Sequence, residues 1–164
     1  LKFFQNVNIK LCDSPSWLRM FKEQYDTDKR TDIVMFYLDA HFYNPKERWV
    51  VQRELDNLKG FKNSIIIVHD FDNGLGHCIY DNERLGFNVI GERLKKVNPN
   101  FHYYTNRLED CDIMKPEEAT DRTMRDNLEY AWSSPRLTYR GILYALPYPD
   151  ELKLRKISDS ERKQ

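Results

Sequence analysis

Two uninterrupted apolar segments, separated by a stretch with helix signals, restrict the fold of this chain more than any other feature of its sequence. The first is residues 33–38 (Ile-Val-Met-Phe-Tyr-Leu), the second is residues 65–68 (Ile-Ile-Ile-Val), and polar residues follow each one directly. Continuous apolar runs are typical of strands that are covered on both faces, as in a parallel sheet. Two such strands around a helix make a βαβ unit, which the sequence places at residues 32–73.

The stretch between the two strands has the start and stop signals of a helix. Residues 44–47 (Asn-Pro-Lys-Glu) offer an N-cap, a first-turn proline and a glutamate at the third helical position, and Gly60 falls where a glycine after the helix end is favoured. One apolar stripe at helical spacing runs between these signals, formed by Val51, Leu55 and Leu58. This stripe predicts a helix that packs on the sheet.

The other predicted elements complete an α/β domain. They are, in chain order, a weak strand at 6–11, a helix with Ser14 as N-cap and Pro15 at its first position, a helix over 87–97, an aromatic strand at 101–105, a helix over 116–131 and a closing strand at 140–146. We expect a single domain over residues 1–150 and an exposed, charged tail over residues 151–164.

Composition argues against several classes of protein. The net charge is zero with 32% charged residues, so the sequence predicts no nucleic-acid partner. No apolar run reaches the length of a membrane span, so we expect neither membrane association nor a signal peptide. The three cysteines lack C-x-x-C spacing and are interpreted as reduced thiols of a cytoplasmic protein.

Ionisable residues follow both strands of the βαβ unit. Asp39 comes directly after the first strand, and His69 and Asp70 come directly after the second. Adjacent parallel strands end at the same edge of a sheet, where α/β proteins bind their ligands, so these three side chains can converge. Two carboxylates and an imidazole could hold a divalent metal, with oxygen ligands favouring Mg²⁺ and histidine favouring Mn²⁺, Zn²⁺ or Fe²⁺. The same carboxylates could instead cap the turns that follow the strands.

Two further histidines could take part in proton transfer. His41 lies two residues beyond Asp39 and could be a metal ligand or a general base, or could pack over the start of the next helix. His77 lies in a glycine-containing loop at residues 71–81, which is our candidate active-site loop. It could act as a base over the site, or be an ordinary exposed loop residue.

Several of these segments resemble one known superfamily. Residues 36–41 (Phe-Tyr-Leu-Asp-Ala-His), the Glu54-Leu55 pair and residues 65–71 (Ile-Ile-Ile-Val-His-Asp-Phe) resemble the C-terminal half of class I S-adenosylmethionine-dependent methyltransferases. The nearest groups are the families related to macrocin O-methyltransferase and cephalosporin hydroxylase. The resemblance implies a Rossmann-like, mostly parallel sheet with helices on both faces and a C-terminal antiparallel hairpin, the hairpin including residues 140–144.

The resemblance also implies roles for particular residues. In those families an Asp after the fourth strand and an acidic pair after the fifth hold Mg²⁺; Asp39 matches the first position and His69-Asp70 falls on the pair, with His69 departing from the usual carboxylate. Residues 12–14 (Cys-Asp-Ser) resemble the Gly-Asp-Ser after strand three, whose Asp contacts the adenine amino group. Asp13, Ser14 and Asp39 are therefore the expected residues for binding S-adenosylmethionine.

One part of the superfamily pattern does not occur in this sequence. The glycine-rich loop after strand one and the acidic residue that ends strand two are missing, although the cofactor needs such a glycine turn for close backbone approach. We therefore expect either a chain whose N-terminal half is cut off or a family member that has lost its cofactor site.

Three functions follow from these observations. The first is O-methylation of a hydroxylated small molecule or sugar, in which a metal on Asp39 and Asp70 acidifies the acceptor hydroxyl and His41 or His77 takes the proton. The second is a non-catalytic binding domain with the methyltransferase fold. The third is a metal-dependent glycosyltransferase or hydrolase that uses no S-adenosylmethionine. A homo-oligomer that covers an exposed sheet edge near residues 6–11 is a further expectation.

Overall fold

The two apolar runs form neighbouring parallel strands around a helix, which confirms the predicted βαβ unit. In this computed structural model β1 (Val34–Leu38) pairs with β4 (Ser64–His69), from Val34 opposite Ser64 to Leu38 opposite Val68. Helix α2 (Val50–Asn57) lies between them in the chain. The structure describes residues 10–25, 32–39, 43–44, 48–73, 79–80, 83–106, 141–149, 155–160 and 162.

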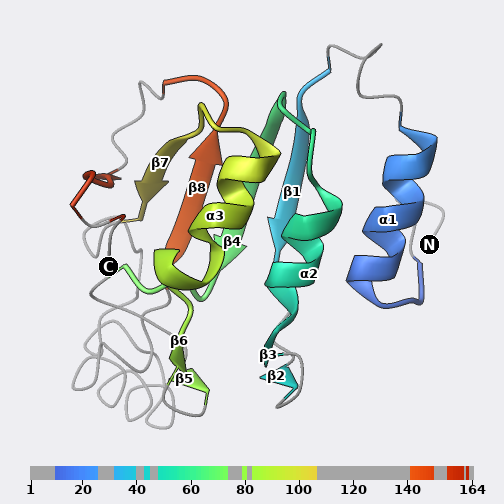
Figure 1. Ribbon diagram of the computed structural model, residues 1–164, viewed down its shortest axis with the longest axis horizontal. Helices are drawn as coiled ribbons and strands as arrows, with labels where there is room; N and C mark the ends of the chain where they lie inside the picture. Colours follow the sequence, from blue (N-terminus) through green and yellow to red (C-terminus); the bar gives the residue numbers. More distant parts are fainter. Residues whose placement is uncertain are drawn as a thin grey trace, which may run out of the picture.

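The sheet is mixed and contains five described strands in the order β1-β4-β8-β7-β9 (Figure 1). The other three are β7 (His102–Thr105), β8 (Ile142–Leu146) and β9 (Arg155–Lys156). Strand β8 is antiparallel to both β4 and β7, and β9 is antiparallel to β7. The expectation of a mostly parallel sheet is therefore wrong for the described strands, whereas the antiparallel closing strand is confirmed.

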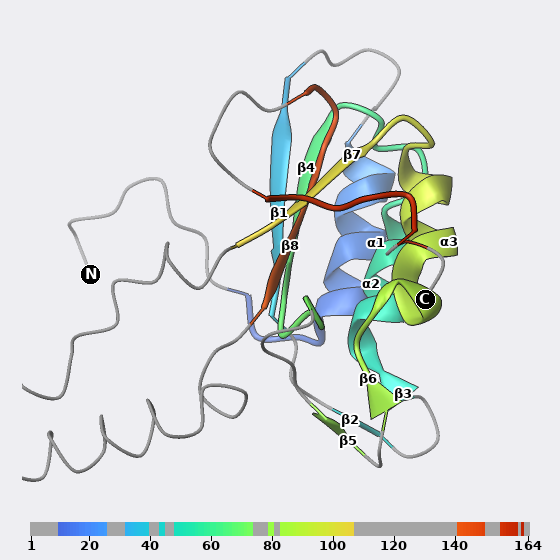
Figure 2. The ribbon, with the colours of Figure 1, turned by 90° about the vertical axis from the view of Figure 1, so that its left-hand side faces the viewer.

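The three described helices all cover the same face of the sheet. They are α1 (Ser14–Gln24), α2 and α3 (Phe87–Val97), and Figure 2 shows them together on one side of the strands. The predicted helix over 116–131 lies outside the described residues, so a helix on the second face stays a prediction. None of these three helices has the length and apolar character that a membrane span requires.

Burial in the two parallel strands alternates, which corrects the prediction that both faces are covered. Phe36 and Leu38 of β1 are buried under the helices, whereas Met35 and Tyr37 are 63% and 53% exposed. On the helical side the fully buried side chains include Leu55 of α2, Leu58 at its C-cap, Ile90 and Leu94 of α3, Ile66 of β4 and Leu143 of β8. The apolar run reflects strand propensity and one buried face.

Helix ends differ from their predicted positions more than helix interiors do. Helix α1 is capped by Asp13 and not by Ser14, because the Asp13 Oδ2 accepts a hydrogen bond from the Ser16 N–H at 3.0 Å. Helix α2 begins at Val50 after Trp49, and Asn44 is no cap because it belongs to a short antiparallel pair, β2 (Tyr43–Asn44) and β3 (Arg48–Trp49).

The end of α2 and the whole of α3 follow the sequence more closely. Gly60 has φ +94°, a conformation that favours glycine, and lies two residues beyond the C-cap Leu58. The stripe formed by Val51, Leu55 and Leu58 is buried as predicted. Helix α3 spans the predicted residues. The predicted strand at 6–11 is not confirmed: residues 10 and 11 are not in a strand, and residues 6–9 lie outside the described part of the chain.

Part of the charged C-terminal segment belongs to the sheet, contrary to the expectation of an exposed tail. Strand β9 pairs with β7, the Ile157 N–H donates to the Tyr103 carbonyl at 3.0 Å, and the Ile157 side chain is only 4% exposed. The Arg162 guanidinium lies 5.6 Å from the centre of the Tyr103 ring. Burial raises the pKa of Tyr103 to about 12, against the opposing effect of Arg162.

Candidate functional site

The carboxyl ends of β1 and β4 bring three of the predicted site residues together. Leu38 pairs with Val68, so the next residues, Asp39 and His69, leave the sheet side by side. The Nδ1 atom of His69 lies 2.9 Å from the Asp39 Oδ1 and 3.4 Å from the Asp70 Oδ1. The convergence expected from the parallel pair is therefore present, and its centre is the imidazole ring of His69.

Asp70 is held in an unusual backbone conformation at the end of β4. It has φ +60° and is only 3% exposed. The neighbouring chain segments fix this turn: the Phe71 N–H donates to the Gly141 carbonyl at 3.0 Å, and a Cβ added to Gly141 would lie 1.9 Å from the Phe71 oxygen. A non-glycine residue keeps such a strained conformation only where contacts with the surrounding structure hold it there, and residues of this kind are often found at functional sites.

Glu54 of α2 adds a buried carboxyl near this cluster, and it was not among the predicted site residues. Its side chain is 2% exposed, and its Oε2 has no hydrogen-bond partner among the described residues. Burial raises the pKa of the Glu54 carboxyl, a hydrogen bond with the Ser14 side chain lowers it, and the charge of Asp39 raises it further. The sequence contains one indication that Glu54 is buried: at helical spacing it lies on the same face as Val51, Leu55 and Leu58.

The site therefore combines one imidazole with three carboxyl groups in different surroundings. The Asp39 side chain is 39% exposed and that of His69 is 22% exposed, whereas Asp70 and Glu54 are buried. An imidazole beside carboxylates can accept a proton, and the carboxylates stabilise the resulting cation. The arrangement suits proton transfer to or from a ligand that approaches the exposed edge of His69.

The cluster does not have the form of a metal site. Within the described part of the chain, no group of three or more His, Cys, Asp or Glu side chains is arranged to hold a metal ion. The two carboxylates face a single ring nitrogen of His69 at ion-pair distances and do not surround a common point. Metal binding by Asp39, His69 and Asp70 stays a prediction that this donor geometry does not favour.

Asp13 and Ser14 lie at the start of α1 and have structural contacts of their own. Hydrogen bonds from Ser16 lower the pKa of Asp13, so its carboxylate is charged and committed to the helix cap. Ser14 connects this helix start to Glu54 through its side chain. Both residues thus adjoin the cluster through α2, while their proposed contact with a cofactor stays a prediction.

The two histidines expected to act as bases, His41 and His77, lie outside the described residues. The start of the candidate loop is described, and it is tied to the sheet. The Asn73 Nδ2 donates to the Asn106 Oδ1 at 3.1 Å, and the same oxygen accepts the Ile142 N–H at 2.8 Å. These two contacts hold the segments that contain Asn73, Asn106 and Ile142 together, close to Asp70.

No family model, curated protein or solved structure matches this chain. Its function is therefore inferred from the geometry of the site.

Proposed function

We propose that this chain is an S-adenosylmethionine-dependent O-methyltransferase domain with a Rossmann-like sheet, which acts on a hydroxyl group of a small molecule or sugar. The contact of the Asp39 carboxylate with the His69 imidazole, at the carboxyl ends of two parallel strands, carries this proposal. A base of this kind is what an acceptor hydroxyl needs, because it must lose its proton as the new bond forms.

The strand order supports the fold assigned in this proposal. Strand β8 opposes both β4 and β7, so β1, β4 and β7 run in one direction and the last of these four strands is inserted between two earlier ones. This is the closing antiparallel arrangement that the sequence resemblance implies. The ligand edge of such a sheet is the carboxyl edge of its parallel strands, where Asp39 and His69 lie.

In the proposed reaction the described residues remove one proton, that of the acceptor hydroxyl. His69 faces the carboxylates through Nδ1, so its Nε2 accepts the proton of the acceptor hydroxyl, and Asp39 orients the ring and stabilises the imidazolium. Bound S-adenosylmethionine would supply a sulfonium methyl group, which moves to the acceptor oxygen while the electrons of the broken carbon–sulfur bond stay on sulfur. No step is assigned to a metal ion.

Calorimetric titration of S-adenosylmethionine and S-adenosylhomocysteine into the chain, with Mg²⁺ and with EDTA, tests the proposal. Saturable binding of both in either buffer would support the proposal and would mean that the glycine-rich loop is dispensable or replaced by another segment. With an acceptor in hand, Asp39→Asn should reduce methyl transfer by roughly 10²-fold or more, because His69 loses the carboxylate that orients its ring. The matched control is Asp72→Asn, since Asp72 pairs with Arg84 at 3.4 Å and has no assigned role in proton transfer.

Two outcomes would count against this function. Failure of both cofactors to bind this chain and a chain extended at its N-terminus would count against the methyltransferase activity and favour a binding domain that shares the fold. Equal loss of activity in Asp39→Asn and Asp72→Asn would show that the Asp39–His69 contact is not the catalytic base.

A further inference from the structure

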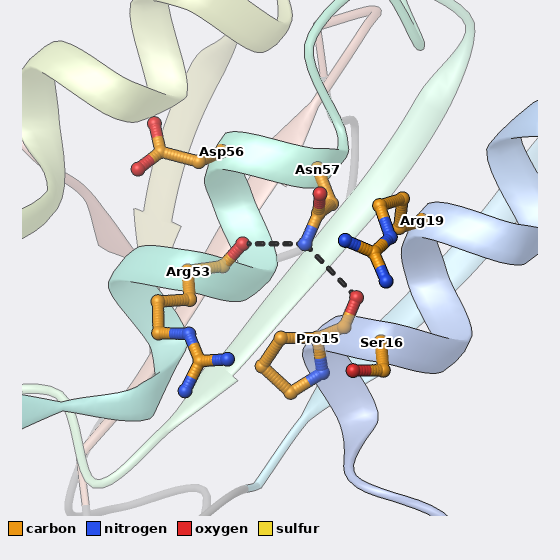
Figure 3. Close-up of a pocket in the computed structure, with 6 residues that line it drawn as sticks. All are labelled: Pro15, Ser16, Arg19, Arg53, Asp56 and Asn57. Atoms are coloured by element: carbon orange, nitrogen blue, oxygen red, sulfur yellow. Dashed lines mark hydrogen bonds between the residues drawn. The ribbon is translucent and has the colours of Figure 1, made fainter.

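The outer side of the helical layer has a groove that the proposed methyl transfer does not use. It has a volume of about 260 Å³ and lies between α1 and α2 (Figure 3). Six residues line it, three from each helix: Pro15, Ser16, Arg19, Arg53, Asp56 and Asn57. None of them belongs to the cluster around His69.

The groove is held in shape by a contact between the two helices. The Asn57 Nδ2 donates to the Pro15 carbonyl of α1 at 2.9 Å and to the Arg53 carbonyl of its own helix at 3.0 Å. Figure 3 shows both of these hydrogen bonds at the centre of the groove. Because one amide fixes both backbones, the walls of the groove are preformed.

The charges around the groove favour an anion. Figure 3 shows the Arg19 and Arg53 side chains on two sides of Pro15, with the Asp56 carboxylate directed away from them. Burial alone would raise the pKa of Asp56, but contacts with Lys59 at 3.2 Å and Arg93 at 3.3 Å outweigh it and lower the pKa. The one acidic residue of the lining is therefore neutralised by cations outside the groove.

The positive field of the two guanidinium groups extends over the start of α1. Hydrogen bonds from Ser16 are the main reason that the pKa of Asp13 is lowered, and the charges of Arg53 and Arg19 contribute to the same shift. The helix dipole of α1 adds to this field, because its positive end lies at Ser14–Ser16.

We propose that this groove binds the phosphate group of a soluble phosphate monoester. Guanidinium groups match phosphate oxygens with paired N–H donors, and two of them from different helices can hold one dianion from two sides. A groove of this volume has room for the phosphate and part of the group that carries it. This site is separate from the proposed methyltransferase chemistry and does not depend on it.

Titration of glucose 6-phosphate and inorganic phosphate, followed by amide chemical shifts, tests the proposal on the whole chain. We expect saturable shifts in residues 15–19 and 53–57 with both phosphates and none with glucose. Arg19→Gln and Arg53→Gln should each weaken binding roughly tenfold or more, because each removes charge-assisted hydrogen bonds. Arg53→Lys should fall between Arg53→Gln and the parent chain, since lysine keeps the charge but loses the paired donors.

The charge-matched control is Lys96→Gln, which removes an exposed cation of α3 that does not line the groove. It should change phosphate affinity by less than about twofold, as expected for a distant screened charge. Equal weakening by Lys96→Gln and Arg53→Gln would overturn the proposal in favour of non-specific attraction. An absence of saturation at millimolar phosphate would overturn it as well.

Discussion

At the scale of single residues, Glu54 is the side chain whose state matters most to the site. Its carboxyl group is buried and lies within the electrostatic reach of Asp39, and one of its oxygens has no hydrogen-bond partner in the part of the chain that the structure describes. Ionisation there places a negative charge in a poorly solvated position, which costs free energy. The protonated form is favoured in the folded chain more than in the unfolded chain.

This environment predicts a pH dependence that Glu54→Gln should remove. Because burial raises the pKa of Glu54 above its usual value near 4.5, the folded chain holds this proton more tightly than the unfolded chain does. Its contribution to stability is complete below that value and is lost as the pH rises through the raised pKa. Glu54→Gln should therefore be more stable than the parent chain at pH 8, by on the order of 1 kcal/mol, with the difference shrinking at pH 4.

Urea unfolding at a series of pH values measures this effect. Glu92→Gln is the control, because Glu92 is exposed and its contact with Lys95 lowers its pKa, the opposite direction to the shift of Glu54. A parent chain and a Glu54→Gln variant with parallel stability curves from pH 4 to pH 8 would contradict the assignment.

The same residue shows what the sequence could and could not predict about the site. The convergence of Asp39 and His69 followed from two parallel strands, because neighbouring residues of a ladder leave the sheet together. The burial of Glu54 could not be predicted, because it depends on which side chains of other elements pack over that face of α2. The prediction of a metal site rested on residue types, and the observed distances to one ring nitrogen suit proton transfer better.

At the scale of elements, helix interiors were predictable, whereas the start of α2 was not. The interior of α3 follows from its own periodic residues, but the start of α2 depends on Trp49, which is 3% exposed. Burial of a Trp side chain contributes roughly 3 kcal/mol or more, whereas an N-cap contributes about 1 kcal/mol. The chain therefore buries Trp49 in front of the helix and uses Asn44 in a short strand pair.

The cap of α1 supplies a prediction at this scale. Asp13→Ala should lower the free energy of unfolding by about 1 kcal/mol, because the Ser16 N–H loses its acceptor. Asp13→Asn should cost much less, since asparagine also caps helices well. Thermal or urea unfolding of the two variants separates the cap from the charge: equal losses in both would mean that the charge, and not the hydrogen bond, is what stabilises α1.

At the scale of the whole molecule, the C-terminal segment completes the hydrophobic core. Ile157 follows β9 and is buried in the core next to Tyr103. Together with β9 it covers the edge of the sheet that β7 would otherwise leave open. Sequence patterns could not predict this contact, because a single apolar residue in a charged segment has no periodicity. Its burial depends on β7, which lies some fifty residues earlier in the chain.

This closure predicts a large difference between two neighbouring residues. Ile157→Ala should destabilise the chain by roughly 2–4 kcal/mol, because it leaves a cavity beside the sheet. Lys156→Ala, one residue earlier and exposed, should remain within about 0.5 kcal/mol of the parent chain. Denaturant midpoints measure both, and similar midpoints for the two variants would place Ile157 outside the cooperative core.

The position of β8 in the sheet also determines the order in which the strands can pair during folding. Strand β8 separates β4 from β7, so until residues 142–146 arrive β4 is paired only with β1, and β7 has no earlier described strand to pair with. Contacts between residues so distant in sequence are slow to form, and strands that lack neighbours are prone to pair with other chains. During synthesis the sheet therefore stays incomplete until β8 has left the ribosome, and until then the edges of β4 and β7 are open to pairing with other chains.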